Sequence, residues 1–279
     1  MTGNDLLPRQ LAELTGARPE PVALAAWSCS VSNGSLHHVG VRLDGDALEL
    51  VAGPLAKPSA WRLLLANSGL RPPARLVISP LDEVLLRSEV LLDGAALDSR
   101  ILDSAIRSLR EGLDAAEDAS SPAWARAEPW DVAQGLTDAG LAGRLLADGR
   151  FRVDPAGAGL RGLMIGPEPA ARVEMLAPGE YPAAVREAVA TLLLRTTASV
   201  RFVRAAAEES GAARLEVVFP AAPAAEELQM AVAALALAGR CAEEIAVLTC
   251  EDVAALYLAI SGNPQTKGGD RICQSLQPM

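Results

Sequence analysis

The chain has 279 residues and a net charge of −10, and half of its residues are hydrophobic although aromatic side chains make up only 3%. This length suits two domains of about 100 to 150 residues, each with an aliphatic core. The negative charge argues against nucleic acid as a partner, and no run of about 20 apolar residues predicts a membrane span. Because the polar start of the chain lacks a signal-peptide core, we expect a cytoplasmic protein.

The first part of the chain predicts helices and strands in a fixed order. Leucines at helical spacing, followed by Gly16, indicate an opening helix. Asn33-Gly34 and Asp44-Gly45 tolerate positive φ, so they favour tight hairpins between three strands of an antiparallel meander. Ser59 marks the start of a second helix, and Pro80-Leu81-Asp82 marks a turn between two later strands. The predicted strands cover 22–31, 36–43, 47–51, 75–79 and 83–91, and the predicted helices cover 6–14, 59–67 and an apolar stripe over 97–113.

The second part predicts the same order of elements, which is α-β-β-β-α-β-β-α. The turn at Ser210-Gly211 separates its last two strands. One additional helical run, 251–260, has no counterpart in the first part. The predicted helices cover 130–145, 181–196 and 224–237, and the predicted strands cover 151–153, 159–165, 171–176, 200–204 and 214–219.

An internal repeat supports this division into two similar domains. Residues 47–54 return as residues 171–178, with Glu49 matching Glu174, a shift of 125 positions. Two further matches continue the correspondence with small drifts in the shift: 39–43 with 161–165, and Leu63-Leu64-Leu65 with Leu192-Leu193-Leu194. We therefore predict an α+β fold of two tandem α-β-β-β-α-β-β-α domains with antiparallel sheets. The predicted divisions are a first domain over 1–116, a linker over 117–129, a second domain over 130–262 and a flexible tail over 263–279.

The element order, the acidic balance and the doubled form resemble the type III secretion chaperone (Tir-chaperone-like) family. In that family a small α+β protomer pairs with a copy of itself, and the dimer holds an extended segment of a client protein. The resemblance covers about residues 4 to 116 and, less clearly, 130 to 240. It implies an intramolecular pseudo-dimer, in which one monomeric chain takes the place of two protomers.

Several residue patterns in the chain are reminiscent of catalytic or ligand-binding motifs, but we favour a structural interpretation of each. Gly157 to Gly162 fits G-x-G-x-x-G, but a strand rather than a helix follows it, so a hairpin turn is favoured over a nucleotide site. His37 and His38 are adjacent on a predicted strand and point to opposite faces, which disfavours a metal site. The four cysteines form no Cys-x-x-Cys pair, so we expect reduced thiols rather than disulfides or zinc. No cofactor, metal or catalytic residue is predicted.

We therefore expect a non-enzymatic protein that binds an extended or partly disordered client segment, with a secreted effector among the client classes that the resemblance implies. Apolar strips are the candidate peptide-binding surface, because an extended peptide pairs with a sheet edge while its side chains enter apolar pockets. Two alternatives stay open: a regulatory or scaffolding protein that binds a folded partner, and an enzyme with an unrecognised pocket. The candidate peptide-binding residues are Leu7, Leu11, Leu14, Val41, Leu43, Leu48 and Leu50.

Overall fold

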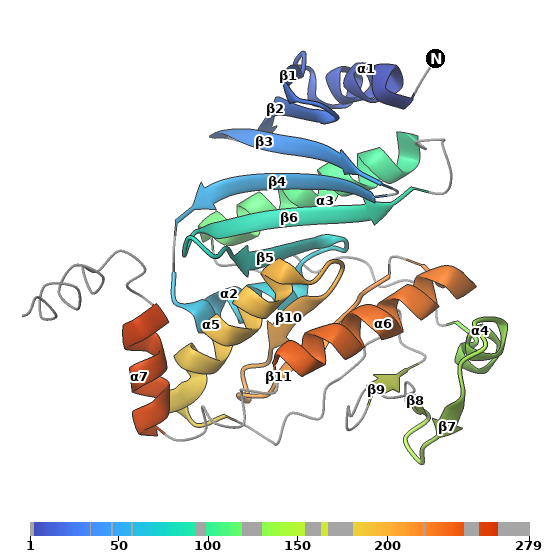
Figure 1. The fold of residues 1–279 in the computed structure, drawn as a ribbon, viewed down its shortest axis with the longest axis vertical. Helices are drawn as coiled ribbons and strands as arrows, with labels where there is room; N and C mark the ends of the chain where they lie inside the picture. The colour runs from blue at the N-terminus through green and yellow to red at the C-terminus, as the bar shows by residue number, and fades with distance from the viewer. Residues whose placement is uncertain are drawn as a thin grey trace, which may run out of the picture.

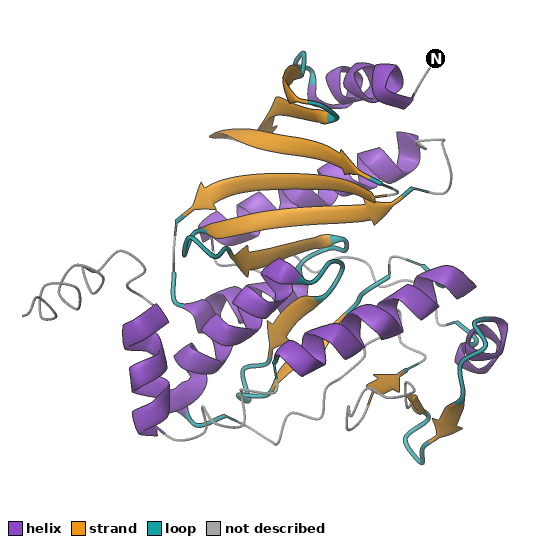
Figure 2. Ribbon diagram, in the orientation of Figure 1, coloured by secondary structure: helices purple, strands orange, loops and turns teal. Residues whose placement is uncertain are grey.

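The computed structural model describes residues 3–33, 35–45, 47–56, 58–92, 99–118, 130–153, 163–166, 181–219, 221–242 and 251–261. These residues form a mixed α+β fold in which all paired strands run antiparallel, so the predicted fold class is confirmed at this level. Figures 1 and 2 show a large sheet at one end of the molecule and a group of helices with shorter strands at the other. We call the described residues up to 118 the first half and those from 130 the second half.

The first half is built on one six-stranded sheet with the strand order β1-β2-β3-β4-β6-β5. Helices α1 and α3 contact one face of this sheet, and α3 lies behind the strands in Figure 1. Helix α2 contacts β5, at one edge of the sheet. The elements are α1 (Gly3–Thr15), β1 (Glu20–Ala23), β2 (Ala26–Asn33), β3 (Ser35–Asp44), β4 (Ala47–Leu55), α2 (Ala60–Gly69), β5 (Ala74–Ile78), β6 (Val84–Leu91) and α3 (Ser99–Asp118).

The alternation of side chains along β4 decides which face of the sheet becomes core. Leu48, Leu50 and Ala52 are buried, whereas Glu49 and Val51 between them are partly exposed. Successive side chains of a strand point to opposite faces, so the apolar set packs towards the helices and the other set towards the open side. The end of helix α5 (Ala183–Ser199) reaches that open side, where Arg87 Nη1 donates to Ala198 O at 2.8 Å.

The predicted strand at 22–31 is wrong in one respect, because it is two strands. β1 and β2 are joined by a tight turn in which Ala25 has a φ of +54°. Positive φ is uncommon for a residue other than glycine, and the apolar run carries no Gly, Pro or Asn to announce a turn there. The remaining order of the first half matches the prediction.

Among the described residues, the second half has three strands before α5 where the first half has four before α2, and its strands form two separate sheets. One sheet has the order β7-β8-β9, and the other pairs β10 with β11. Helix α7, which confirms the predicted extra helix, contacts α5. The elements are α4 (Val132–Asp138), β7 (Gly143–Leu145), β8 (Phe151–Val153), β9 (Leu163–Ile165), α5 (Ala183–Ser199), β10 (Arg204–Ala207), β11 (Ala213–Glu216), α6 (Ala225–Cys241) and α7 (Glu251–Ser261).

Two further element boundaries in the second half correct the sequence-based predictions. The helix predicted to run to Leu145 ends at Asp138, because Gly140 takes a φ of +64° and the chain then enters β7. The strand predicted from Gly159 begins, within the described residues, at Leu163. The predicted strand at 171–176 and the tail at 263–279 lie outside the described residues.

The hairpins β5–β6 and β10–β11 have the same construction. Ser79 N donates to Glu83 O at 2.8 Å, and Glu208 N donates to Ala212 O at the same distance. The fourth residue of each turn has positive φ: Asp82 at +64° and Gly211 at +104°. A single shift of 129 residues, from 79 to 208, relates these positions, and the same shift relates Leu63-Leu64-Leu65 to Leu192-Leu193-Leu194. The two halves are thus locally equivalent in structure across helix, strand and turn.

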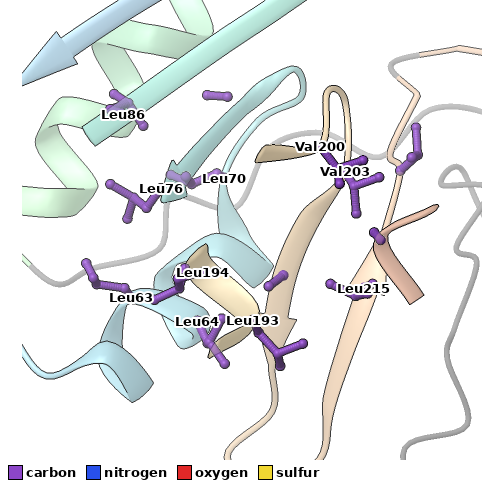
Figure 3. Packing of buried hydrophobic residues seen from close by; sticks show 14 of the residues in the cluster. Leu63, Leu64, Leu70, Leu76, Leu86, Leu193, Leu194, Val200, Val203 and Leu215 are labelled. Carbon is purple, nitrogen blue, oxygen red and sulfur yellow. The ribbon is translucent and has the colours of Figure 1, made fainter. Parts of the chain in front are cut away.

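The halves pack against each other through these equivalent elements. Helix α2 contacts α5, α2 contacts β10, and α5 contacts β5. Figure 3 shows Leu63 and Leu64 of α2 facing Leu193 and Leu194 of α5. Each half therefore contacts the other through a helix and a strand at corresponding places in its element order.

Candidate functional site

Asn67, a fully buried residue of α2, is one of several residues that make polar contacts across the interface. Its Nδ2 donates to Leu76 O at 3.0 Å and to Ala205 O at 2.8 Å, and its Oδ1 accepts from Leu76 N at 2.7 Å. Leu76 and Ala205 are related by the same shift of 129 residues. One side-chain amide therefore bonds to equivalent carbonyls of β5 and β10.

The second half also caps helix α2 of the first. The Glu187 carboxylate accepts from Ala60 N at 2.6 Å and from Trp61 N at 3.3 Å. These N–H groups lie in the first turn of α2, where backbone donors lack partners within the helix and the helix dipole favours an anion. The neighbouring Arg186 guanidinium lies 5.2 Å from the centroid of the Trp61 ring, a cation–π contact between the halves.

A cavity of about 290 Å³, which we call the central cavity, lies where the halves meet. Both halves contribute corresponding segments to its wall. Residues 72–75 lie at the start of β5 and residues 202–204 at the start of β10, while residues 89–91 lie at the end of β6 and residues 217–219 just after β11. The first turns of α3 and α6 complete the wall. Each of the three wall segments from the first half therefore has a counterpart about 129 residues later, in the second half, that also lines the cavity. Its lining residues are Pro72, Pro73, Ala74, Arg75, Glu89, Val90, Leu91, Arg100, Ile101, Ser104, Phe202, Arg204, Val217, Val218, Phe219, Glu227 and Met230.

Two buried arginines, Arg75 and Arg204, stand at equivalent places in the cavity wall. Arg75 is 2% exposed, and its Nη2 lies 2.7 Å from Glu89 Oε2. Arg204, the counterpart of Arg75, donates from Nε to Glu216 at 2.7 Å and from Nη1 to Leu70 O at 2.8 Å. Glu216 also accepts from Arg214 at 2.8 Å. Removing one partner from such a buried ion pair leaves an uncompensated charge, which typically costs about 3 to 5 kcal/mol.

A second hollow, which we call the sheet groove, has a volume of about 450 Å³ and lies on the open face of the six-stranded sheet. Its floor includes Gly40 and Val51, and a Cβ added at Gly40 would meet only Val51 O, at 3.8 Å. Arg42 Nη2 lies 3.0 Å from Glu49 Oε2 at its side. The groove residues are Val22, Ala26, Trp27, Gly40, Val41, Arg42, Glu49, Val51, Arg87, Glu89, Ala198, Ser199 and Arg201.

The sheet groove adjoins an exposed sheet edge. Strand β1 pairs only with β2 in the sheet, all four of its residues are exposed, and Val22 is 65% exposed. The opposite edge strand, β5, is buried and contacts α2 and α5. Pro21 and Glu20 in β1 belong to the residue types that limit pairing between edges of different molecules. The exposed edge and the groove together form the accessible part of the sheet.

The predicted peptide-binding residues are brought together by the fold, on the helix-covered face of the sheet. Leu7, Leu11, Val41, Leu48 and Leu50 are buried in the core, and Leu14 and Leu43 are partly buried against it. Val41 also borders the sheet groove. The regular spacing of these apolar residues is therefore explained by the packing of α1 and α3 on the sheet. Peptide binding at these residues stays a prediction, and a peptide would reach the four buried leucine side chains only by displacing a helix. Sequence reasoning did not identify Gly40 or Arg75, because their significance depends on which segments meet in space.

The titratable groups outside these hollows have ordinary structural explanations. Burial raises the pKa of the Cys29 thiol to about 11 and also raises the pKa of the Tyr181 hydroxyl. Among the described residues, no group of three or more His, Cys, Asp or Glu side chains is placed to hold a metal ion. Within the same residues, no helix combines the length and apolar character required to cross a membrane.

Comparison with known proteins adds one weak structural similarity. The sequence matches no protein-family model and no curated protein. A chain of the heterodimeric ExoU–SpcU complex from the type III secretion system of Pseudomonas aeruginosa is similar to 40% of this chain, over 96% of its own length. The sequence identity is 20% and the TM-score is 0.31. A similarity of this size leaves the function to be argued from the geometry of the chain itself.

Proposed function

We propose that this chain is a non-enzymatic, chaperone-like protein of the cytoplasm that holds an extended segment of a client protein. Its two halves act as an intramolecular pseudo-dimer, so one monomer replaces a pair of protomers. The observation that carries this proposal is the reciprocal packing of α2 and β5 against α5 and β10, with the same hairpin geometry in both halves. This is the arrangement expected of a duplicated protomer that once paired with a copy of itself.

The sheet groove is the surface that suits an extended client. Because Gly40 has no side chain, the backbone of β3 is accessible at that position and the space above it is open. The neighbouring Val51 provides an apolar surface at the floor of the groove. The flanking Arg42 and Glu49 present both charge signs. An extended peptide binds such a surface by main-chain contacts and by placing alternate side chains in apolar hollows. The net charge of −10 favours basic clients over acidic ones.

A matched pair of variants tests this location. Gly40→Phe fills the groove, whereas His38→Phe places the same ring two residues away on the same strand and face, outside the groove lining. Phenylalanine suits strands, so both variants are expected to keep the fold. Client is captured with each tagged protein from the native cytoplasm and then subjected to limited proteolysis and mass spectrometry.

Wild type and His38→Phe are expected to protect a short client fragment that does not fold alone, and Gly40→Phe is expected to lose it. Equal capture by all three proteins would contradict the groove as the client site. A globular protected fragment would contradict the extended-segment proposal.

Such a globular fragment would support the second candidate, a scaffold that binds a folded partner. Helix α7 favours this candidate, because Leu256 and Ile260 on it are 59% and 68% exposed and lie one helical turn apart. Exposed apolar side chains on neighbouring turns are typical of protein–protein contact surfaces.

A further inference from the structure

We propose that the central cavity binds an aliphatic monocarboxylate, with the carboxylate at Arg75 and the chain among the apolar lining residues. The cavity has about the smallest volume found for small-molecule sites, which are mostly apolar with a few placed polar groups. Glu89 borders both this cavity and the sheet groove, but the proposed ligand lies in the central cavity, and the inference does not depend on the proposed function. The apolar lining includes Val90, Leu91, Ile101, Val217, Phe219 and Met230.

Arg75 supplies the polar group of this site. Its side chain is 2% exposed, and Nη2 is 2.7 Å from Glu89 Oε2. Its Nε is also buried and makes no hydrogen bond with the residues that the structure describes, whereas Nη2 is engaged by Glu89. A guanidinium has five donors, and buried polar groups in folded proteins are nearly always hydrogen-bonded. A buried guanidinium with one carboxylate contact is therefore suited to accept a further anionic ligand.

The shape of the guanidinium selects a carboxylate. Its planar donor fork matches the two oxygens of a carboxylate, which accept parallel hydrogen bonds. Arg75 lies on β5 and lines the cavity together with Arg100, Ile101 and Ser104 from the first turns of α3. The N-terminal end of a helix carries partial positive charge, which adds to the attraction for an anion.

The acidic side chains of the lining are already engaged. Glu89 Oε2 accepts from Phe202 N at 2.9 Å and contacts Arg75. Glu227 Oε2 accepts from Ala224 N at 2.8 Å, at the start of α6. The counterpart guanidinium, Arg204, is held by Glu216 and by Leu70 O. The two corresponding arginines of the cavity therefore differ in their partners. Arg204 is fully engaged, and Arg75 is the one available to a ligand.

The test uses the full chain with decanoate as the probe, and decanol and decylamine as matched probes that lack the carboxylate. Binding is measured by titration calorimetry and by the chemical shift of ¹³C-carboxyl decanoate. Arg75→Gln removes the guanidinium, and Ile101→Trp fills the cavity while leaving every buried charge in place. The control is Arg107→Gln, because Arg107 lies on the exposed side of α3 and pairs with Asp103.

We expect decanoate to bind with a stoichiometry of one, and decanol and decylamine to bind at least about tenfold more weakly, since the carboxylate bonds are lost. Arg75→Gln and Ile101→Trp are each expected to weaken decanoate binding by at least about tenfold, and Arg107→Gln to leave it unchanged. Equal affinity for decanoate and decanol, unchanged binding by Ile101→Trp, or no binding up to about 1 mM would overturn the inference.

Discussion

Asn67 and Ala205 belong to different halves of the chain, and a hydrogen bond of 2.8 Å from Nδ2 to the carbonyl oxygen joins them. The same nitrogen donates to Leu76 O, the equivalent carbonyl of the first half. The amide therefore bonds both edge strands from one buried position. This contact links local folding of α2 and β5 to association of the two halves.

Replacing Asn67 by alanine should destabilise the whole chain. The change leaves the carbonyls of Leu76 and Ala205 and the N–H of Leu76 without the bonds they make now. Buried groups without partners cost about 1 to 3 kcal/mol each, with partial relief by rearrangement, so we expect a loss of about 2 to 4 kcal/mol. Urea denaturation measures it, with the exposed Gln134→Ala as control. A loss below about 0.5 kcal/mol, the range of ordinary surface substitutions, would contradict the assigned role.

Glu187→Ala removes the cap that the second half supplies to helix α2. The carboxylate now accepts from Ala60 N and Trp61 N, so its loss should cost about 0.5 to 2 kcal/mol, as for other N-terminal caps. Hydrogen exchange should quicken at the first turn of α2, more than 120 residues away from the substitution in sequence. Glu226→Ala, an exposed residue in the first turn of α6, serves as the comparison. Exchange in α2 that does not change would argue against the cap.

The buried thiol of Cys29 predicts a pH dependence of stability. Its pKa is raised from 9.0 to about 11 in the folded chain because burial disfavours the thiolate. Below pH 9 both states keep the proton, and stability is unaffected. Between about pH 9 and 11 only the unfolded state releases it, so the free energy of unfolding falls as the pH rises.

The urea midpoint of Cys29→Ala should therefore decrease less than that of the wild type between pH 8.5 and pH 10.5. These two pH values lie on either side of 9.0, the pKa of the thiol in the unfolded chain. The raised pKa of Tyr181 acts in the same direction in both proteins, so the difference between their slopes isolates the thiol. Parallel slopes for the two proteins would show that Cys29 titrates normally.

Local signals in the sequence were sufficient for most of the first half. Asp44-Gly45 predicts the β3–β4 hairpin, where Gly45 has a φ of +66°, and Ser59 predicts the start of α2, where its hydroxyl accepts from Arg62 N. The turn at Ala25 was missed because alanine carries no turn signal. The early end of α4 did carry a signal, since Gly140 is a typical residue after a helix C-terminus.

The positions of the candidate functional surfaces could not be predicted from local sequence patterns. The periodicity of Leu48 and Leu50 identifies a buried face, but it does not separate a helix-covered face from a client-binding one. Arg75 and Glu89 form an ion pair only because β5 and β6 are neighbours, and Phe202 joins them from the other half. Cavities between halves depend on how the halves associate, which a single sequence does not specify.

The central claim, that the halves associate as a duplicated pair of protomers, is tested most directly by cutting the chain between them. A protease site is inserted between residues 118 and 130, the purified protein is cleaved, and light scattering after gel filtration gives the mass. We expect both fragments to co-elute at the mass of the intact 29.0 kDa chain, because α2, β5, α5 and β10 hold them together without a covalent link. Separation of the fragments into two peaks under native conditions would contradict the account.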